Sequence, residues 1–492
     1  MQSGSIEKLY EDNFNIYKAF TTAEQKLFLS YASSDAEGKP LRNSIIITKI
    51  KKIFPKVNTQ SDVIKKNLMI TNKQAMFHEL LTNLKSLIDG EIIDDIWHDV
   101  YLYYSSQTVW NEKLTTAIKG IGSDNNPEKI SKENIEKLYG KVLRTSISKL
   151  EQYKSCPFSY YLKYGLKLSD KNKFKIQSID TGTFMHDVID SFFKIIKEEK
   201  INVKEITDEK LNKIIDNIID EKLALSKNYI FISTEKYKIL TMRLKKVIKK
   251  SMKYIIESLR LSKFDIYETE LEFKENTKYK PLKIILEDGK KAEVIGKIDR
   301  IDLYKNEDGK YIRIIDYKSS VKSLDLNEVI GGVQIQLLTY LNEVTKLEDA
   351  QPGGVLYFNL LDPIIKSSKN LSEEEIENEI RKKFKMQGLI IADINIIKSM
   401  DTSLEKGASN VIPAYIDAKG ELSRTRSSIA TKEQFQMLQE YTNKIIKQIA
   451  KEILSGDIDI KPTYYLKNKK TPCEYCEYKS ICGFGKRNCK DG

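Results

Sequence analysis

The amino-acid sequence predicts an α/β fold in which a small group of strands is surrounded by many helices. Residues 292–304 and 311–318 carry the apolar and β-branched content of strands, and the Asp-Gly pair between them is typical of a hairpin turn. A helical pattern at about 332–345 and an apolar strand at 353–360 follow. The rest of the chain has mainly helical patterns, up to a cysteine-rich tail.

The charge of the 492-residue chain favours a polyanionic partner. Lysine and arginine number 82 against 70 aspartates and glutamates, which gives a formal charge of +12. Such an excess attracts DNA and makes binding salt-sensitive, although lysine-rich faces that are merely solvated give the same count. No apolar run reaches the roughly 18–20 residues of a membrane span, and the N-terminus lacks a signal-peptide pattern. We therefore expect a cytoplasmic protein without membrane attachment.

Two small regions are expected before the main domain. Residues 1–60 mix short helical and strand-like pieces, among them the isoleucine-rich run 44–50. Residues 61–140 are predicted to be a helical connecting region, in which the helices between about 60 and 120 have aromatic faces. A loop rich in Gly and Asn indicates a domain boundary between 120 and 145.

Residues 141–492 are expected to form one larger domain. Ser148-Lys-Leu-Glu151 matches a capping box, which predicts a helix that begins here and runs to Cys156. Residues 182–199 have the apolar spacing of an amphipathic helix, and lysine-rich helices follow.

A pair of carboxylates and a lysine are the candidate catalytic group. Side chains alternate along a strand, so Asp316 and Lys318 of the D-x-K triplet share one face, and Asp299 lies on the strand before them across the hairpin. Neighbouring carboxylates repel each other and are best satisfied by a divalent cation, either Mg²⁺ or Mn²⁺. Such a metal lowers the pKa of bound water and stabilises charge on a scissile phosphate, and Lys318 would assist by orienting that water or neutralising charge.

Simpler interpretations exist for each of these residues. The triplet also fits a surface hairpin with an ordinary Asp–Lys ion pair. His186, on the predicted amphipathic helix, can pair with Asp190 one turn later. Asp302 lies on the same strand as Asp299, but its odd offset points it to the opposite face.

Four of the five cysteines lie in the last twenty residues. Cys473, Cys476 and Cys482 follow a C-x₂-C-x₅-C pattern, which suits either Zn²⁺ or an iron–sulfur cluster. The fourth ligand is either the nearby Cys489 or Cys156, which lies more than 300 residues earlier. The spacing alone leaves both the metal and the fourth ligand open.

Four motifs occur in a fixed order along the chain. They are G-x-x-x-H ending at His186, G-x-x-D ending at Asp299, D-x-K at Asp316 to Lys318, and Q-x-x-x-Y from Gln336 to Tyr340. In this order they resemble the RecB-type branch of the PD-(D/E)XK nucleases, which implies a restriction-endonuclease-like core.

The resemblance also implies roles for these residues. An Mg²⁺ site would be built by His186, Asp299, Asp316 and the backbone carbonyl of Tyr317. Lys318 would be the catalytic lysine. The last motif would hold the DNA backbone or the lysine, through Gln336 and Tyr340.

Both ends of the large domain resemble one family more closely. The segment 146–160 and the tail are similar to the start and end of the iron–sulfur nuclease domain in B subunits of AddAB-type helicase–nucleases. The resemblance implies a [4Fe-4S] cluster, which would join the two ends of the domain as a staple and constrain the unfolded chain. Its ligands would be Cys156, Cys473, Cys476 and Cys482.

The start of the chain resembles the end of a superfamily 1 helicase-type domain. Residues 20–32 match that pattern, but Thr22 replaces the arginine that contacts ATP, and no phosphate-binding loop occurs. We therefore expect residues 1–60 to be a helicase-like remnant, 61–140 a connecting region, and no ATP hydrolysis by this chain. CRISPR-associated exonucleases share the other motifs but not this first segment. The family's B subunit is normally far longer, so the chain is expected to be its C-terminal portion.

The resemblance implies a 5′→3′ exonuclease that cuts one strand of DNA. An A subunit would form a heterodimer with this chain and supply the unwound strand during double-strand-break repair and recombination. Two alternatives remain: a non-catalytic module that binds DNA or docks the partner, and an iron–sulfur nuclease that acts alone.

Overall fold

The computed structural model describes residues 5–35, 39–59, 70, 72–88, 90–121, 127–169, 175–365, 371–467 and 469–484. Cys489, the alternative cluster ligand, lies outside these residues. The chain divides into two compact units, Met1–Ile121 and Gly122–Gly492, called here the N-terminal and C-terminal units. Each unit has its own hydrophobic core.

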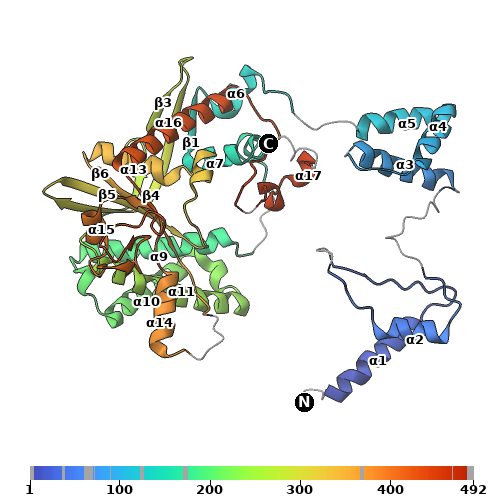
Figure 1. The fold of residues 1–492 in the computed structure, drawn as a ribbon, viewed down its shortest axis with the longest axis horizontal. Coiled ribbons are helices and arrows are strands. Elements are labelled where there is room, and N and C mark those ends of the chain that lie inside the picture. The colour runs from blue at the N-terminus through green and yellow to red at the C-terminus, as the bar shows by residue number, and fades with distance from the viewer. Residues whose placement is uncertain are drawn as a thin grey trace. The chain divides into compact units, whose positions relative to one another are not determined.

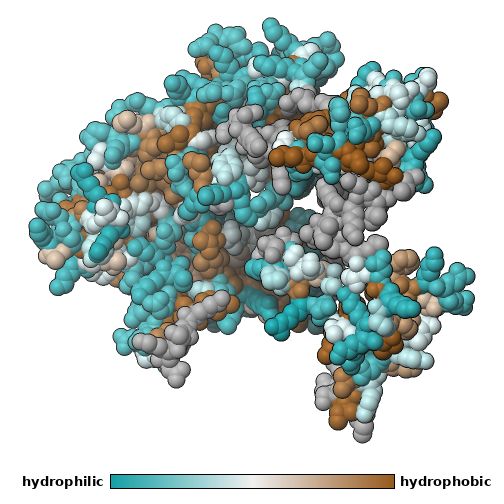
Figure 2. Space-filling view, turned by 45° about the vertical axis from the view of Figure 1, so that its right-hand side comes forward, coloured by the Kyte–Doolittle hydropathy of each residue, from teal (hydrophilic) through white to brown (hydrophobic). Residues whose placement is uncertain are grey.

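The N-terminal unit is helical. Its helices are α1 (Ser5–Thr21), α2 (Ile45–Ile53), α3 (Lys73–Ile88), α4 (Ile96–Ser106) and α5 (Thr108–Ile121). Helices α3 to α5 share a core with close aromatic contacts among Phe77, Tyr104 and Trp110. Apolar side chains are also visible on the surface of this unit (Figure 2), and Phe28 is 89% exposed.

The isoleucine-rich run at 44–50, one of the short helical and strand-like pieces expected in this region, belongs to helix α2 and its N-cap. Ser44 caps α2, because its side chain accepts a hydrogen bond from the Ile46 N–H. A favourable N-cap begins the helix despite the β-branched residues that follow.

The C-terminal unit is built on a mixed sheet, as the α/β prediction requires. The strand order is β1-β4-β5-β6-β7-β10, and β2 and β3 both pair with β4. Their bounds are β1 (Val142–Ser146), β2 (Asp265–Phe273), β3 (Leu282–Ile285), β4 (Lys291–Asn306), β5 (Gly309–Lys318), β6 (Gln351–Asn359), β7 (Gln387–Ile391) and β10 (Ile429–Ala430). A separate two-stranded ladder joins β8 (Gly407–Ala408) and β9 (Tyr415–Ile416).

The predicted hairpin and the strand that follows it are confirmed. Strands β4 and β5 pair antiparallel, and β6 lies parallel to β5 after a crossover through helices α12 (Leu326–Ile330) and α13 (Gln336–Leu347). The later part of the chain is less helical than expected, since β7 and β10 extend the sheet beyond β6. Strand β10 has only two residues, and β7 is a continuous buried run that shows no alternation.

Helices lie on both sides of the sheet (Figure 1). One group contains α9 (Ser178–Glu198), α10 (Asp208–Ala224), α11 (Glu235–Arg260) and α14 (Glu373–Lys383), and α13 and α16 (Lys432–Leu454) pack together on the other side. The remaining α-helices are α6 (Lys132–Tyr139), α7 (Ile147–Ser155), α8 (Pro157–Tyr160), α15 (Ile394–Met400) and α17 (Lys479–Cys482). The described residues also form a short π-helix, η1 (Tyr161–Gly165), and the 3₁₀-helices η2 (Val203–Glu205), η3 (Ser226–Ile232) and η4 (Pro472–Tyr475). Among the described helices, none is both long and apolar enough to cross a membrane.

The predicted capping box at Ser148 does not form. Helix α7 begins after Ser146, whose side chain accepts a hydrogen bond from the Lys149 N–H. Glu151 instead turns to another helix: its carboxylate accepts hydrogen bonds from the Ile335 and Gln336 N–H groups at the start of α13. Glu151 therefore makes a tertiary contact with α13 instead of the local contact that the capping-box pattern predicted within α7.

Candidate active site and cysteine cluster

The β4–β5 hairpin brings the two predicted carboxylates together. Arg300 pairs with Ile315 in the ladder, so Asp299 and Asp316 lie one position beyond them on adjacent strands. Burial, with the neighbouring Asp299 adding to it, raises the pKa of Asp316 to about 6, although Lys318 opposes this shift. A buried site with two adjacent carboxylates is electrostatically unfavourable without a cation.

His186 and Lys318 each make an ion pair with one of these carboxylates. The Nδ1 atom of His186 is 3.3 Å from Oδ2 of Asp299, and Nζ of Lys318 is 2.6 Å from Oδ2 of Asp316. Burial alone would lower the pKa of His186, but Asp299 and Asp316 raise it above its ordinary value. His186 therefore contacts the site, while Asp190 pairs with Lys194 instead.

Tyr317 contributes its backbone to the same cluster. Its N–H donates a 2.8 Å hydrogen bond to Oδ2 of Asp299, the oxygen that also faces His186. Asp302 stays apart from this cluster: it is fully buried and bound to Arg300 and Arg313. This placement agrees with the prediction that Asp302, at an odd offset from Asp299, lies on the opposite face of the strand.

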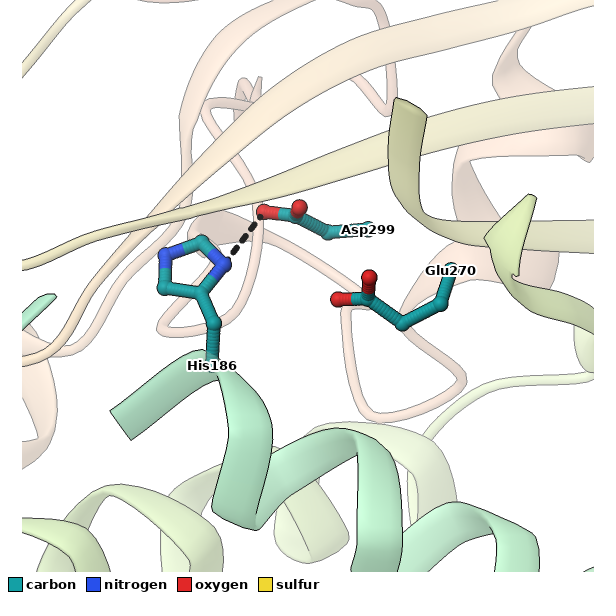
Figure 3. A group of neighbouring side chains, drawn as sticks. All are labelled: His186, Glu270 and Asp299. Atoms are coloured by element: carbon teal, nitrogen blue, oxygen red, sulfur yellow. Dashed lines mark ion pairs between the residues drawn. The ribbon is translucent and has the colours of Figure 1, made fainter. Parts of the chain in front are cut away.

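Glu270 joins the site, although none of the sequence motifs includes it. Figure 3 shows its carboxylate turned toward His186 and Asp299, and one ligand atom from each of the three lies within 4.8 Å of the others. Thr269 and Leu271 pair with Arg300 and Ile298, so Glu270 stands opposite Asp299.

The backbone at Glu270 is unusual for a strand. Its φ of +52° lies in the left-handed region, which costs energy in a residue other than glycine. Its side chain is largely buried and also pairs with Lys297. The alternating pattern Tyr267-Glu-Thr-Glu-Leu-Glu-Phe273 is the signal for this strand that could have identified the residue.

The donor set suits a divalent metal. It offers one imidazole nitrogen and several carboxylate oxygens, on side chains that water reaches poorly. Oxygen-rich sites of this kind are typical of Mg²⁺ and Mn²⁺. The residues present therefore fit the ion that the motifs imply.

The Q-x-x-x-Y helix lies against the G-x-x-D segment rather than on the carboxylates. Gln336 is the first residue of α13, and the Tyr340 ring is stacked on Phe273 at 5.7 Å between centroids. A side chain at Gly296 would overlap the Tyr340 hydroxyl and ring, so only glycine lets the helix approach β4 here. The hydroxyl group of Tyr340 thereby reaches the start of the segment that carries Asp299.

The predicted cluster ligands Cys156, Cys473, Cys476 and Cys482 line one cavity of about 290 Å³. None of the four forms a disulfide. Cys156 follows α7, and the other three lie on or beside η4 and α17. Burial raises the pKa of the Cys156 thiol, and the nearby Cys473 and Cys476 raise it further. The fold thus brings together thiols more than 300 residues apart.

Comparison with known proteins gives relatives over nearly the whole chain. A protein from Clostridium acetobutylicum, described as the B subunit of an ATP-dependent helicase/deoxyribonuclease, is 40% identical over 96% of this chain and 42% of its own length. Proteins of the same description from Clostridium novyi and Caldanaerobacter subterraneus are 41% and 38% identical, over 97% of this chain and 43% and 42% of their lengths. The chain therefore spans less than half the length of these relatives.

Two family descriptions match different parts of the chain. Residues 66–120, within the N-terminal unit, match the fifth domain of the ATP-dependent helicase/deoxyribonuclease AddB. Residues 144–483 match the PD-(D/E)XK nuclease superfamily, and they contain the carboxylates, His186, Lys318 and the four clustered cysteines. With this match over most of its length, the chain belongs to the PD-(D/E)XK nuclease superfamily.

Proposed function

We propose that this chain is a metal-dependent deoxyribonuclease that cuts single-stranded DNA. The observation that carries the proposal is the buried hairpin end where Asp299 and Asp316 lie together, with His186 on one carboxylate and Lys318 on the other. Carboxylates that hold a divalent metal, with a cation beside them, can support hydrolysis of a phosphodiester bond.

The metal would be held by residues of three elements. Helix α9 supplies His186, β4 supplies Asp299, and β5 supplies Asp316 and the carbonyl group of Tyr317. We add Glu270 of β2 to this set, because one of its carboxylate oxygens lies within 4.8 Å of ligand atoms of His186 and Asp299. An Mg²⁺ ion held there would lower the pKa of bound water, so that it can act as a nucleophile at neutral pH, and would stabilise charge on the phosphate.

Lys318 would act beside the metal rather than on it. Burial lowers the pKa of its ammonium group, but Asp316 raises it above the ordinary value, so the group is charged at neutral pH. A compact cation there can orient a water molecule or neutralise charge that develops on the phosphate. Gln336 and Tyr340, at the start of α13, would hold the DNA backbone or the lysine.

The four cysteines would hold a [4Fe-4S] cluster that closes the nuclease domain. The domain boundaries proposed for the chain are 1–60 for a helicase-like remnant, 61–140 for a connecting region and 141–492 for the nuclease. By similarity to the relatives described as B subunits, we propose that the chain works in the cytoplasm with an ATP-driven A subunit, which unwinds duplex DNA at double-strand breaks. The expected polarity of cutting is 5′→3′.

The test is nuclease activity of the anaerobically purified chain on single-stranded DNA with Mg²⁺, with iron content measured on the same samples. We expect release of a 5′-terminal label, complete loss of cutting in Asp316→Ala, and about four irons per chain. Asp308→Ala, an exposed aspartate in the turn of the same hairpin, is the matched control and should cut normally.

A chain that cuts only when a cognate A subunit is added would remain a nuclease, but not one that acts alone. If it binds DNA, and neither it nor its complex cuts in an Asp316-dependent way, the chain is a binding module and the proposal is wrong.

A further inference from the structure

Tyr317, the middle residue of the D-x-K triplet, has a buried side chain whose contacts the motifs do not explain. Its ring lies edge-to-face with the His186 imidazole, at 6.0 Å between centroids. Its backbone N–H binds Asp299. One residue therefore contacts both the imidazole and a carboxylate of the candidate metal site.

The hydroxyl group of Tyr317 points away from those two residues, to a second group of charges. Nη1 of Arg300 donates to this hydroxyl at 3.3 Å. The Nε and Nη2 atoms of the same guanidinium group donate 2.7 Å hydrogen bonds to the two oxygens of Asp302. The carboxylate of Asp302 also accepts a 2.9 Å hydrogen bond from Nε of Arg313. We call Arg300, Asp302 and Arg313 the arginine–aspartate network.

The arginine–aspartate network is too deeply buried to contact a substrate that arrives from solvent. Each of its three side chains is at most 2% exposed. Burying two guanidinium groups around one carboxylate carries a large desolvation cost, and apolar side chains of similar volume are often at least as stabilising. Two nitrogens of Arg313 also find no hydrogen-bond acceptor in the described part of the chain. Stability alone is therefore a poor explanation for these charges.

We propose that Arg300 is a positioning residue for the metal site and acts through the Tyr317 hydroxyl. The two-pronged pair with Asp302 fixes the guanidinium group, which leaves Nη1 aimed at the tyrosine. With its hydroxyl held in this way, Tyr317 keeps its ring in contact with His186 and its backbone N–H in position to bind Asp299. Outer-shell partners of this kind change metal affinity or activity by about 10- to 100-fold. The inference rests on the metal site of the proposed function.

The first variant is Tyr317→Phe, which removes only the hydroxyl and keeps the ring against His186 and Phe358. We expect the dissociation constant for Mn²⁺, measured by calorimetry on the full chain, to rise about tenfold. The electron paramagnetic resonance spectrum of bound Mn²⁺ should change as well, which a purely structural role would not require. Tyr254→Phe is the matched control, since it loses a buried hydroxyl that binds Glu377 outside the site.

The second variant is Arg300→Lys, which keeps a positive charge beside Asp302 but has one nitrogen in place of the guanidinium fork. If Arg300 acts through Tyr317, its effect on Mn²⁺ affinity should disappear in the Tyr317→Phe background. The double variant should then bind Mn²⁺ with the same affinity as Tyr317→Phe alone. Additive losses would overturn the proposal, as would an unchanged Mn²⁺ affinity in a folded Tyr317→Phe chain.

Asp316→Ala separates this inference from the proposed function. If Asp316→Ala binds Mn²⁺ as well as the unaltered chain does, or if neither binds it, then the proposed metal site is wrong and the positioning role is wrong with it. If the unaltered chain binds Mn²⁺ in an Asp316-dependent way and Tyr317→Phe binds it equally well, only the positioning role is wrong. Thermal melting of each variant shows that a loss of affinity comes from a folded chain.

Discussion

At the residue scale, the hairpin gives its two carboxylates different surroundings. Asp316 is 6% exposed and is paired with Lys318, whereas Asp299 faces His186, Glu270 and the Tyr317 N–H. The first arrangement keeps a cation next to one carboxylate, and the second gathers potential metal ligands around the other. Removing Lys318 and removing Glu270 should therefore have separable effects.

Lys318→Ala should reduce the rate of cutting more than it reduces metal affinity. In the proposed function the ammonium group stabilises charge that develops during the reaction, and loss of such a group lowers kcat by about 10²- to 10³-fold. The Mn²⁺ dissociation constant should stay equal or fall, because a like charge leaves the site. Kinetics on single-stranded DNA and calorimetry check the two quantities. Lys305→Ala, further along β4, is the control, and a parallel loss of metal affinity in Lys318→Ala would contradict the assignment.

Glu270→Gln should show the opposite pattern. Because it removes a negative charge opposite Asp299, the concentration of Mg²⁺ needed for half-maximal cutting should rise about 10-fold or more. High Mg²⁺ should restore most of the rate. The control is Glu272→Gln, two residues along the same strand, where the carboxylate pairs with Lys274 instead. Equal Mg²⁺ requirements in the two variants would remove Glu270 from the ligand set.

At the element scale, the sequence predicted those parts of the site that lie on regular, strongly patterned segments. The β4–β5 hairpin, with Asp299 and Asp316, follows from strand composition and a turn signal, and α13 follows from helical spacing. Glu270 was missed because β2 was not recognised, and its place opposite Asp299 depends on a sheet register that no local pattern fixes. The partner of Glu151 could not be predicted for the same reason, since α13 begins more than 180 residues later.

Glu151 links two elements and gives the fold a pH dependence. Burial raises the pKa of this carboxyl group to about 7, although the Gln336 and Ile335 N–H groups and Lys322 lower it. Because the folded chain holds the proton more tightly than the unfolded chain, this contribution to stability is full below about pH 4.5 and is lost as the pH rises toward 7.

Glu151→Gln should remove that dependence, since the amide oxygen still accepts both backbone hydrogen bonds and carries no charge. Relative to the unaltered chain, the variant should gain up to about 3 kcal/mol of unfolding free energy between pH 5 and pH 8. Urea denaturation at the two pH values measures the difference, with the exposed Glu133→Gln of α6 as the control. A constant difference between the variants at both pH values would show that Glu151 does not titrate in this range.

At the scale of the whole molecule, the cysteine cavity joins segments from the two ends of the C-terminal unit. Cys156 lies just after α7, and Cys473, Cys476 and Cys482 lie near the end of the chain. Sequence spacing left Cys489 and Cys156 as competing fourth ligands. The cavity that Cys156 shares with the other three thiols supports the arrangement that the family resemblance implied. A cluster bound there would close a loop of more than 300 residues, which constrains the unfolded chain strongly.

Cys156→Ser should therefore lose iron and destabilise one unit selectively. The chain has two tryptophans, Trp97 and Trp110, and both lie in the N-terminal unit, so their fluorescence reports on that unit alone. Both units contribute to the helical circular dichroism signal. Because they have separate cores, the tryptophan transition should stay in place, while the part of the circular dichroism transition that does not follow tryptophan fluorescence moves several degrees lower. Iron retained at the wild-type level in Cys156→Ser would exclude Cys156 as a ligand. Iron loss with an unchanged melting temperature of the C-terminal unit would instead mean that the cluster binds there without stabilising the fold.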